Sequence, residues 1–157
     1  MSSIDIARFK EVLGHFLTGV AVVTAATPEG PVGFTCQTFG ALSLDPTLIS
    51  FSAASASHSW PKARDVGVVG VNILADDQEA IARVFGKPGN EKFVGIGWSA
   101  APNGAPLIEG ALAHLEGHIE FVTTQGDHDI VVVAVGYALS HQGAPLVFYR
   151  GGFRSID

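Results

Sequence analysis

Charged side chains are scarce in this sequence, and the basic ones are scarcest. Asp, Glu, Lys and Arg together make up 15% of the 157 residues, against roughly 25% in an average soluble domain. The formal net charge is −6, and no Lys or Arg occurs between Lys92 and Arg150. Nucleic-acid binders need a basic surface, because phosphate neutralisation supplies much of their affinity. We therefore expect no nucleic-acid partner, and a surface so poor in charge favours buried contact between subunits.

Cysteine and long apolar runs are also missing. The single cysteine, Cys36, excludes an intrachain disulfide and a Cys/His metal cluster. Asp5 and Glu11 lie where a signal peptide would have an unbroken apolar core. The longest apolar stretch, 130–139, is half of the roughly 20 residues that a membrane-spanning helix needs. We expect a cytoplasmic protein without membrane association, formed by one domain over residues 1–157.

Glycine, by contrast, is abundant, and the chain is organised as many short elements. Its 19 glycines and 8 prolines are typical of strands joined by tight turns. Apolar residues at three- and four-residue spacing predict a first helix over 6–17, which Gly19 ends. Alternating or β-branched runs then predict seven strands, over 19–27, 33–39, 48–53, 66–74, 111–122, 128–139 and 144–149.

Two short helices are expected between these strands. The first, over 57–64, starts at a serine cap and has Pro61 in its first turn. The second, over 76–89, begins with Asp76 and Glu79 in a capping-box pattern. Three short helices and about seven strands, without regular βαβ alternation, predict a mainly β fold: a closed or sandwich-like antiparallel barrel.

Residues 53–64 form the best candidate site for an anion. A helix start offers free backbone N–H groups and a partial positive charge. The segment adds hydroxyl donors and cationic side chains, namely Ser55, Ser57, Ser59, His58, Lys62 and Arg64. The alternative is an ordinary helix capped by Ser57 or Ser59.

The strand expected around Cys36 carries small polar side chains on both faces. Thr35, Gln37 and Phe39 share one face, and Cys36 and Thr38 share the other. Hydroxyl and amide groups beside backbone groups suit the polar edge of a planar heterocycle; the alternative is an exposed strand that ends in a turn. Cys36 is expected to be a packing residue, because nothing nearby in the sequence predicts a lowered thiol pKa.

Histidines occur in two further patterns. His114, Glu116, His118 and Glu120 alternate along one strand, a spacing that could bind a metal but that the wet face of a half-buried sheet produces equally. We expect no metal site there.

His128 lies in a predicted turn between Asp127 and Asp129, which would favour its charged form. It is either a solvated turn residue or part of a ligand site. Downstream, the segment 149–153 combines an aromatic residue, a cation and two glycines, a set that could let the backbone approach a ligand closely.

Taken in order, these pieces resemble the flavin reductase-like proteins, which are split β-barrel flavoproteins and include the small reductase components of two-component flavin-dependent monooxygenases. The segments that carry the resemblance are FKEVLGHFLTGVAVVTA, PVGFTCQTFGALSLDPTLISFS, SHSWPKARDVGVVGVNIL, EKFVGIGW, APLIEGALAHLEGHIE, GDHDIVVVAVG and APLVFYRGGF. They span about residues 8–154, and their ordered set is specific where no single motif is. The resemblance implies a split antiparallel β-barrel of the Greek-key, FMN-binding type with short flanking helices.

The resemblance also implies an activity. An NAD(P)H:flavin oxidoreductase of this kind works as a homodimer in which NADH or NADPH transfers a hydride to FMN or FAD near the interface. The reduced flavin would then pass to a partner monooxygenase. The alternative is a related split-barrel protein that binds flavin, deazaflavin or haem without reducing free flavin.

Site residues carry over from the resemblance position by position. The isoalloxazine ring would lie among Thr35, Cys36, Gln37, Thr38 and Phe39. The ribityl chain and phosphate would be held by Ser52, Ser57, His58 and Ser59, with Lys92 as a further phosphate contact and Asn72 near the flavin. The nicotinamide would be bordered by His128, the catalytic candidate, and by Tyr149, Arg150, Gly151 and Gly152.

Overall fold

The computed structural model describes residues 2–156, and it is built mainly of strands. In chain order the elements are α1 (Ile6–Leu13), β1 (Thr18–Gly19), β2 (Ala21–Thr27), β3 (Gly30–Cys36), β4 (Gly40–Leu44), β5 (Thr47–Ala54), α2 (Trp60–Val66), β6 (Val68–Ile73), α3 (Glu79–Phe85), β7 (Trp98–Ala100), β8 (Pro106–Ile108), β9 (Ala113–Gln125), β10 (His128–Ser140), β11 (Leu146–Tyr149) and β12 (Gly152–Ser155). Each of the seven predicted strands is present, as β2, β3, β5, β6, β9, β10 and β11. The short strands β1, β4, β7, β8 and β12 were not predicted.

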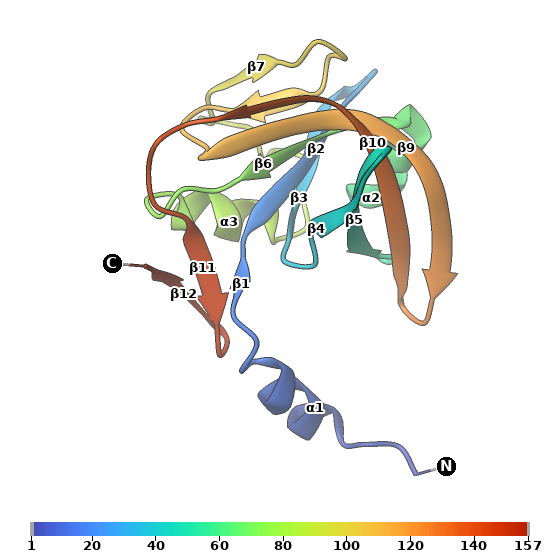
Figure 1. The fold of residues 1–157 in the computed structure, drawn as a ribbon, viewed down its shortest axis with the longest axis vertical. Coiled ribbons are helices and arrows are strands. Elements are labelled where there is room, and N and C mark those ends of the chain that lie inside the picture. Colours follow the sequence, from blue (N-terminus) through green and yellow to red (C-terminus); the bar gives the residue numbers. More distant parts are fainter. Residues whose placement is uncertain (1, 157) are drawn as a thin grey trace.

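A seven-stranded antiparallel sheet forms the body of the molecule, in the order β3-β2-β6-β9-β10-β5-β4. The strands β9 and β10 have 13 residues each and form a long, strongly curved hairpin within this sheet (Figure 1). Within the described chain the edge strands β3 and β4 do not pair with each other, so the barrel is split along this side. Two small sheets, β1-β11-β12 and β7-β8, complete the fold. The prediction of a mainly β, antiparallel split barrel with short helices is confirmed.

An aromatic cluster joins α2 to the sheet and stabilises the region where the candidate site lies. Trp60, the first residue of α2, has no exposed surface, and Phe51 of β5 is 1% exposed. The Trp60 ring packs edge-on against Phe51 and Phe34, with centroids 6.0 Å and 6.2 Å away. Such edge-to-face pairs add to the large hydrophobic area that aromatic rings bury. The start of α2 is therefore anchored to β3 and β5.

The helices α2 and α3 lie where they were predicted, but the prediction of a capping box at the start of α3 is wrong. The backbone N–H of Asp76 donates to Ala144 O at 2.9 Å, which holds Asp76 outside the helix. Gln78 occupies the N-cap position instead and makes no side-chain cap bond. Its amide bridges the neighbouring loops, accepting from Ala75 N and donating to Glu109 O, each at 2.9 Å.

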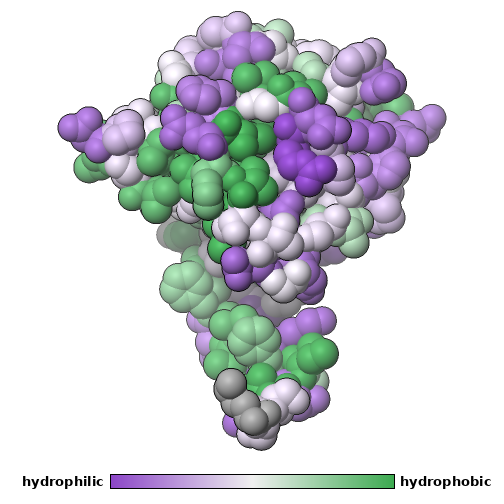
Figure 2. Space-filling view, turned by 90° about the vertical axis from the view of Figure 1, so that its right-hand side faces the viewer, coloured by the Kyte–Doolittle hydropathy of each residue, from purple (hydrophilic) through white to green (hydrophobic). Residues whose placement is uncertain are grey.

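The first helix is shorter than predicted and projects from the body (Figure 1). It ends at Leu13 rather than near residue 17 because the carbonyl of Gly14, which a longer helix would use, accepts the N–H of Arg150 at 2.9 Å. None of its residues is buried. We call residues 4–17 the N-terminal arm; Figure 2 shows hydrophobic side chains gathered on it.

No helix within residues 2–156 combines the length and the apolar character that crossing a membrane would require.

Candidate functional site

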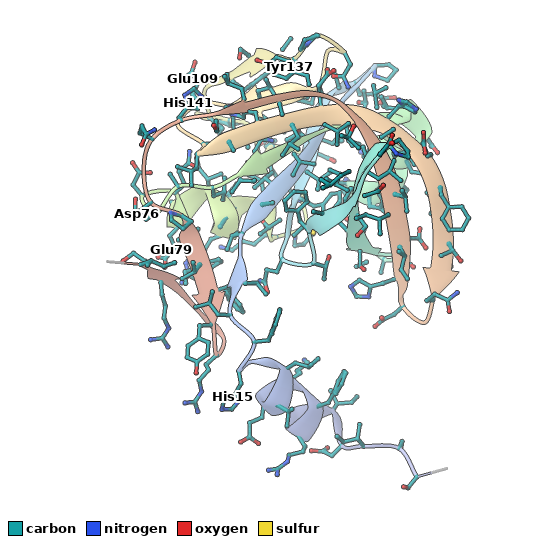
Figure 3. The ribbon with its side chains drawn as sticks, in the orientation of Figure 1. His15, Asp76, Glu79, Glu109, Tyr137 and His141 are labelled. Atoms are coloured by element: carbon teal, nitrogen blue, oxygen red, sulfur yellow. The ribbon has the colours of Figure 1, made fainter. Side chains whose placement is uncertain are left out.

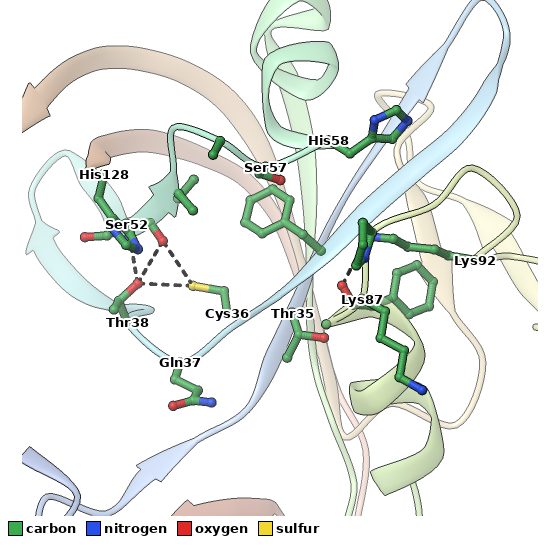
Figure 4. A pocket seen from close by; sticks show the side chains of 17 residues that line it. Thr35, Cys36, Gln37, Thr38, Ser52, Ser57, His58, Lys87, Lys92 and His128 are labelled. Carbon is green, nitrogen blue, oxygen red and sulfur yellow. Dashed lines mark hydrogen bonds between the residues drawn. The ribbon is translucent and has the colours of Figure 1, made fainter. Parts of the chain in front are cut away.

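A cavity of about 490 Å³ lies where β3, β5 and β10 meet the segments around α2 and α3 (Figure 4). Sites for small molecules usually have about 300–1,000 Å³. The residues that line it are Phe34, Thr35, Cys36, Gln37, Thr38, Ser52, Ala53, Ala54, Ala56, Ser57, His58, Phe85, Gly86, Lys87, Pro88, Lys92 and His128. Segments far apart in the sequence thus share one site.

The structure brings most of the predicted flavin-site residues to this cavity. They are Thr35, Cys36, Gln37, Thr38, Ser52, Ser57, His58, Lys92 and His128. The other predicted residues, which are Phe39, Ser59, Asn72, Tyr149, Arg150, Gly151 and Gly152, do not line it.

One wall is held by hydrogen bonds between the turn after β3 and strand β5. Thr38 Oγ1 accepts the N–H of Ser52 at 2.7 Å and lies 3.1 Å from the Ser52 carbonyl, to which it donates. Cys36 Sγ lies 3.2 Å from Thr38 Oγ1 and 3.8 Å from the same carbonyl (Figure 4). Burial raises the pKa of the Cys36 thiol, so it stays neutral at neutral pH. These contacts agree with the expected packing role of Cys36.

The loop between β5 and α2 forms a second wall. Ser57 Oγ accepts the N–H of Trp60, the first residue of α2, at 3.2 Å, whereas Ser59 occupies the N-cap position and makes no side-chain cap bond. The Ser57 hydroxyl proton can therefore donate to a ligand. The His58 ring bonds to the Asn90 side chain, and Lys62 Nζ lies 3.5 Å from both groups. Ser59 is 2% exposed and does not line the cavity.

Lys92 is held by neutral oxygen atoms at the back of the cavity. Its Nζ donates to Gly33 O at 3.0 Å, Phe85 O at 3.2 Å and Ser59 Oγ at 3.3 Å. Burial lowers the pKa of Lys92. Because all three ammonium protons are engaged, Lys92 acts as a fixed positive charge and as a bridge between β3, α3 and the start of α2.

His128 reaches the cavity from the start of β10, and its two acidic neighbours behave differently. Its Nδ1 lies 2.7 Å from Asp127 Oδ1, and the Asp127 side chain is 97% exposed. This hydrogen bond lowers the pKa of Asp127. The Asp129 side chain points to the other face of the strand, since successive residues of a strand face opposite sides; it is buried and bonds to Trp60. The prediction that both carboxylates act on His128 is therefore wrong for Asp129.

Asn72 and the turn after β11, which the resemblance implies near the flavin and the nicotinamide, do not line the main cavity. Asn72 has no exposed surface; its Nδ2 donates to Val22 O at 3.0 Å and its Oδ1 accepts from Ile108 N at 2.8 Å. Its amide thus satisfies backbone groups in the core. Residues 149–152 form the turn between β11 and β12, which meets the N-terminal arm through the bond from Arg150 N to Gly14 O.

A neighbouring cavity of about 430 Å³ contains Phe39 and borders the site. Phe16 and Leu17 of the arm line it together with Gln37 and Thr38, which line the main cavity as well. The N-terminal arm therefore ends beside the candidate site.

Sequence reasoning missed the segment that follows α3. The cavity is lined by Phe85, the last residue of α3, and by Gly86, Lys87 and Pro88 after it. The sequence pattern predicts only the end of a helix there. A lysine between two helix-ending residues in a chain with few cations was the available signal. The small residues Ala53, Ala54 and Ala56 lie within the predicted segment 53–64, although nothing in their side chains points to a ligand.

The alternating histidines and glutamates of β9 have structural partners. His114 Nε2 lies 2.8 Å from Ile108 O, and Glu116 Oε2 accepts from Asn103 N at 2.6 Å. His15 and His141 lie toward opposite ends of the molecule (Figure 3). Within residues 2–156 no group of three or more His, Cys, Asp or Glu side chains is arranged to hold a metal ion.

The charge of the cavity is the reverse of the charge of the chain. The lining contains Lys87, Lys92, His58 and His128. None of the described residues that line it is Asp or Glu, although the chain carries a net charge of −6. The rest of the lining consists of hydroxyl and amide side chains, three alanines, two phenylalanines, Cys36, Gly86 and Pro88. The cavity can thus bind an anion attached to a flat, partly polar ring, and it lacks the carboxylate pair typical of acid–base hydrolysis.

Comparison with known proteins agrees with this chemistry. The family described as "Flavin reductase like domain" matches residues 13–157. The reductase subunit HsaB of a flavin-dependent monooxygenase from Rhodococcus jostii is 41% identical over 99% of this chain and 80% of its own. The FMN reductase (NADH) SmoA of Agrobacterium fabrum is 38% identical over 92% of this chain and 83% of its own.

Solved structures show the same fold. The NADH:FAD oxidoreductase SgcE6 of Streptomyces globisporus, in complex with NAD and FAD fragments, superposes with a TM-score of 0.92 at 30% identity, over 100% of this chain and 98% of that one. With matches over nearly its whole length, this chain belongs to the flavin reductase-like family.

Proposed function

We propose that this protein is an NAD(P)H:flavin oxidoreductase that reduces FMN or FAD and supplies the reduced flavin to a partner monooxygenase. The observation that carries the proposal is a cavity lined by two lysines and two histidines and by no described carboxylate, in an acidic chain. Such a lining selects an anionic ligand. Relatives named as FMN reductase (NADH) and as a monooxygenase reductase subunit support the reaction and the partner.

The lining fits a flavin phosphate and ring. We assign the phosphate to Ser57, His58 and Lys87, because they combine a free hydroxyl proton with cationic groups at the same cavity. Thr38 and Ser52 present polar groups for the edge of the ring, and the alanines of 53–56 present a small, flat surface. A flavin bound here would accept the hydride, and that chemistry belongs to the cofactors rather than to the chain.

His128 is the proposed residue for the nicotinamide. The Asp127 carboxylate holds its ring by Nδ1, which leaves Nε2 free for a hydrogen bond toward the cavity. Its task is to orient the nicotinamide for hydride transfer, which needs reacting atoms about 3–3.5 Å apart. The name of SmoA includes NADH, and we propose NADH as the donor for this chain.

We further propose that residues 1–157 form one domain and that two copies associate through the N-terminal arm. The arm exposes Ile6 by 70%, Phe9 by 49% and Phe16 by 78%, a set of apolar side chains that water does not favour. The arm adjoins the main cavity at Gln37 and Thr38, so a second copy seated there would lie beside the flavin.

Spectroscopic titration tests the proposed activity. Adding FMN, FAD or riboflavin to the purified protein should perturb the visible flavin bands, with tighter binding of the phosphorylated forms. NADH oxidation at 340 nm should then depend on added flavin. A Soret band in the purified protein, or NADH oxidation that flavin does not stimulate, would contradict the proposal.

A further inference from the structure

Asp129 is a buried carboxylate beside the candidate site that the proposed reaction does not use. It is the second residue of β10 and is 3% exposed. Its neighbour His128 lines the cavity, whereas strand alternation directs Asp129 to the opposite face. Of these two consecutive residues, His128 therefore faces the cavity, and Asp129 faces the core behind the cavity wall.

Both oxygen atoms of the Asp129 carboxylate are engaged. Oδ2 accepts from the Trp60 indole Nε1 at 2.8 Å and lies 3.8 Å from Arg64. Oδ1 accepts from Thr124 Oγ1 at 2.7 Å and from Ser55 Oγ at 3.5 Å. The bonds from Trp60 and Thr124 lower the pKa of Asp129, so it is ionised at neutral pH. An ionised acceptor makes stronger hydrogen bonds than a neutral one.

Two of these partners are the ends of the loop that forms the cavity wall. Ser55 begins the loop, and its N–H also donates to Asp127 O at 3.0 Å. Trp60 ends the loop where α2 starts, and its ring is fixed between Phe34 and Phe51. Between these two anchored residues the chain passes through Ser57 and His58. The carboxylate therefore holds both ends of the loop and ties it to the strand that carries His128.

We propose that Asp129 is a positioning residue that acts through Trp60 and Ser55 to hold the 55–59 loop in the conformation that binds the flavin phosphate. This inference rests on the proposed function. A loop already held in its bound conformation loses less entropy when the ligand binds. Loosening the loop should therefore weaken the phosphate contacts specifically, while the ring contacts on β3 and β5 remain.

The test compares FMN with riboflavin, which lacks the phosphate, in wild type and variants. Asp129→Asn fills the same space and keeps an acceptor for the indole but removes the charge. Trp60→Phe keeps an aromatic ring and removes the indole N–H. Thr124→Val is the matched control, because it deletes an equally short bond to the same carboxylate from a residue of β9, outside the loop.

We expect Asp129→Asn and Trp60→Phe each to raise the Kd for FMN about five- to tenfold, the scale of one hydrogen bond, and the Kd for riboflavin less than twofold. Thr124→Val should change both constants by less than twofold. The double variant Asp129→Asn/Trp60→Phe should raise the Kd for FMN by less than the product of the two single effects, since the two substitutions share the bond between Asp129 and Trp60.

A purely structural role predicts a different pattern, and melting temperatures are measured alongside to recognise it. If Asp129→Asn lowers the melting temperature but leaves the ratio of FMN to riboflavin affinity unchanged, the positioning role is overturned. If Asp129→Asn does not fold, Trp60→Phe decides by the same ratio. Equal binding of FMN and riboflavin by the wild type would instead contradict the proposed phosphate site itself, whatever the variants do.

Discussion

The N-terminal arm and the strands around the cavity carry equally clear apolar patterns, yet only the strands bury theirs. Phe51 on β5 is 1% exposed, whereas Phe9 on α1 is 49% exposed and no residue of α1 is buried. The strand residues find partners across a seven-stranded sheet. The helix meets the rest of its chain mainly through the bond between Gly14 and Arg150. The same apolar sequence pattern can therefore mark residues buried within one chain or, as we propose for the arm, residues that a second copy covers.

The largest expected effect is on the free energy of unfolding, and it differs between the two regions. Phe51→Ala removes a buried ring and should lower the free energy of unfolding by about 3–5 kcal/mol. Phe9→Ala should change it by less than about 0.5 kcal/mol in the isolated subunit. Chemical denaturation at low protein concentration measures both. Similar losses for the two variants would mean that the arm packs against its own chain.

Measurements of self-association test whether the arm joins two copies of the chain. The double substitution Phe9→Glu/Leu13→Glu should weaken association by at least about 100-fold, because burying each of these side chains contributes about 1.5–3 kcal/mol. Sedimentation should show a wild type of twice the 16.3 kDa chain mass and a monomeric variant. The variant Arg8→Gln/Lys10→Gln, on the same helix, is the control. A monomeric wild type that reduces flavin would refute the proposed dimer.

The cavity should respond to the loss of a phosphate contact. Ser57→Ala removes a hydroxyl that can donate to the phosphate, and it should weaken FMN binding by about 1.5–3 kcal/mol, the range for hydrogen bonds to charged groups. Riboflavin binding should change little. Ser99→Ala is the control, because this serine lies on β7 and does not line the cavity. Equal weakening of FMN and riboflavin by Ser57→Ala would show that the serine only stabilises the start of α2.

His128 should affect the nicotinamide more than the flavin. His128→Ala and His128→Gln should raise the KM for NADH several-fold, while flavin affinity changes by less than about 1 kcal/mol, the scale of one neutral hydrogen bond. Steady-state NADH oxidation at saturating FMN is the measurement. Unchanged kinetics in both variants would identify His128 as a solvated residue at a strand end.

The smallest expected effect is a pH dependence of stability. The pKa of Asp129 is lowered in the folded protein by its bonds from Trp60 and Thr124 relative to about 3.9 in an unfolded chain. Its contribution is therefore complete above pH 4 and is lost as the pH falls through the folded-state pKa. The difference in melting temperature between wild type and Asp129→Asn should shrink below about pH 4. Asp127→Asn, at an exposed position, should show a smaller difference at every pH.

Local patterns predicted those features of the molecule that depend on neighbours in the sequence. β-branched and alternating runs predicted β2, β5, β9 and β10, because alternation decides which side of a strand is apolar. The same reasoning misplaced the capping box of α3, since Asp76 is bonded to Ala144, which is remote in sequence. The resemblance, and not a local pattern, predicts Asn72 near the flavin; in the structure its buried amide bonds to the backbone groups of Val22 and Ile108.

The sequence by itself determined the mainly β class, the family and the chemical types available at the site, because composition, periodicity and motif order are properties of the linear chain. Only the tertiary structure decided which of these groups meet. It joins Thr38 to Ser52 and adds Lys87 from the segment after α3, while Ser59 and Asp129 are buried outside the lining of the cavity. Sheet register and buried hydrogen bonds between distant residues set these directions, and no local pattern encodes them.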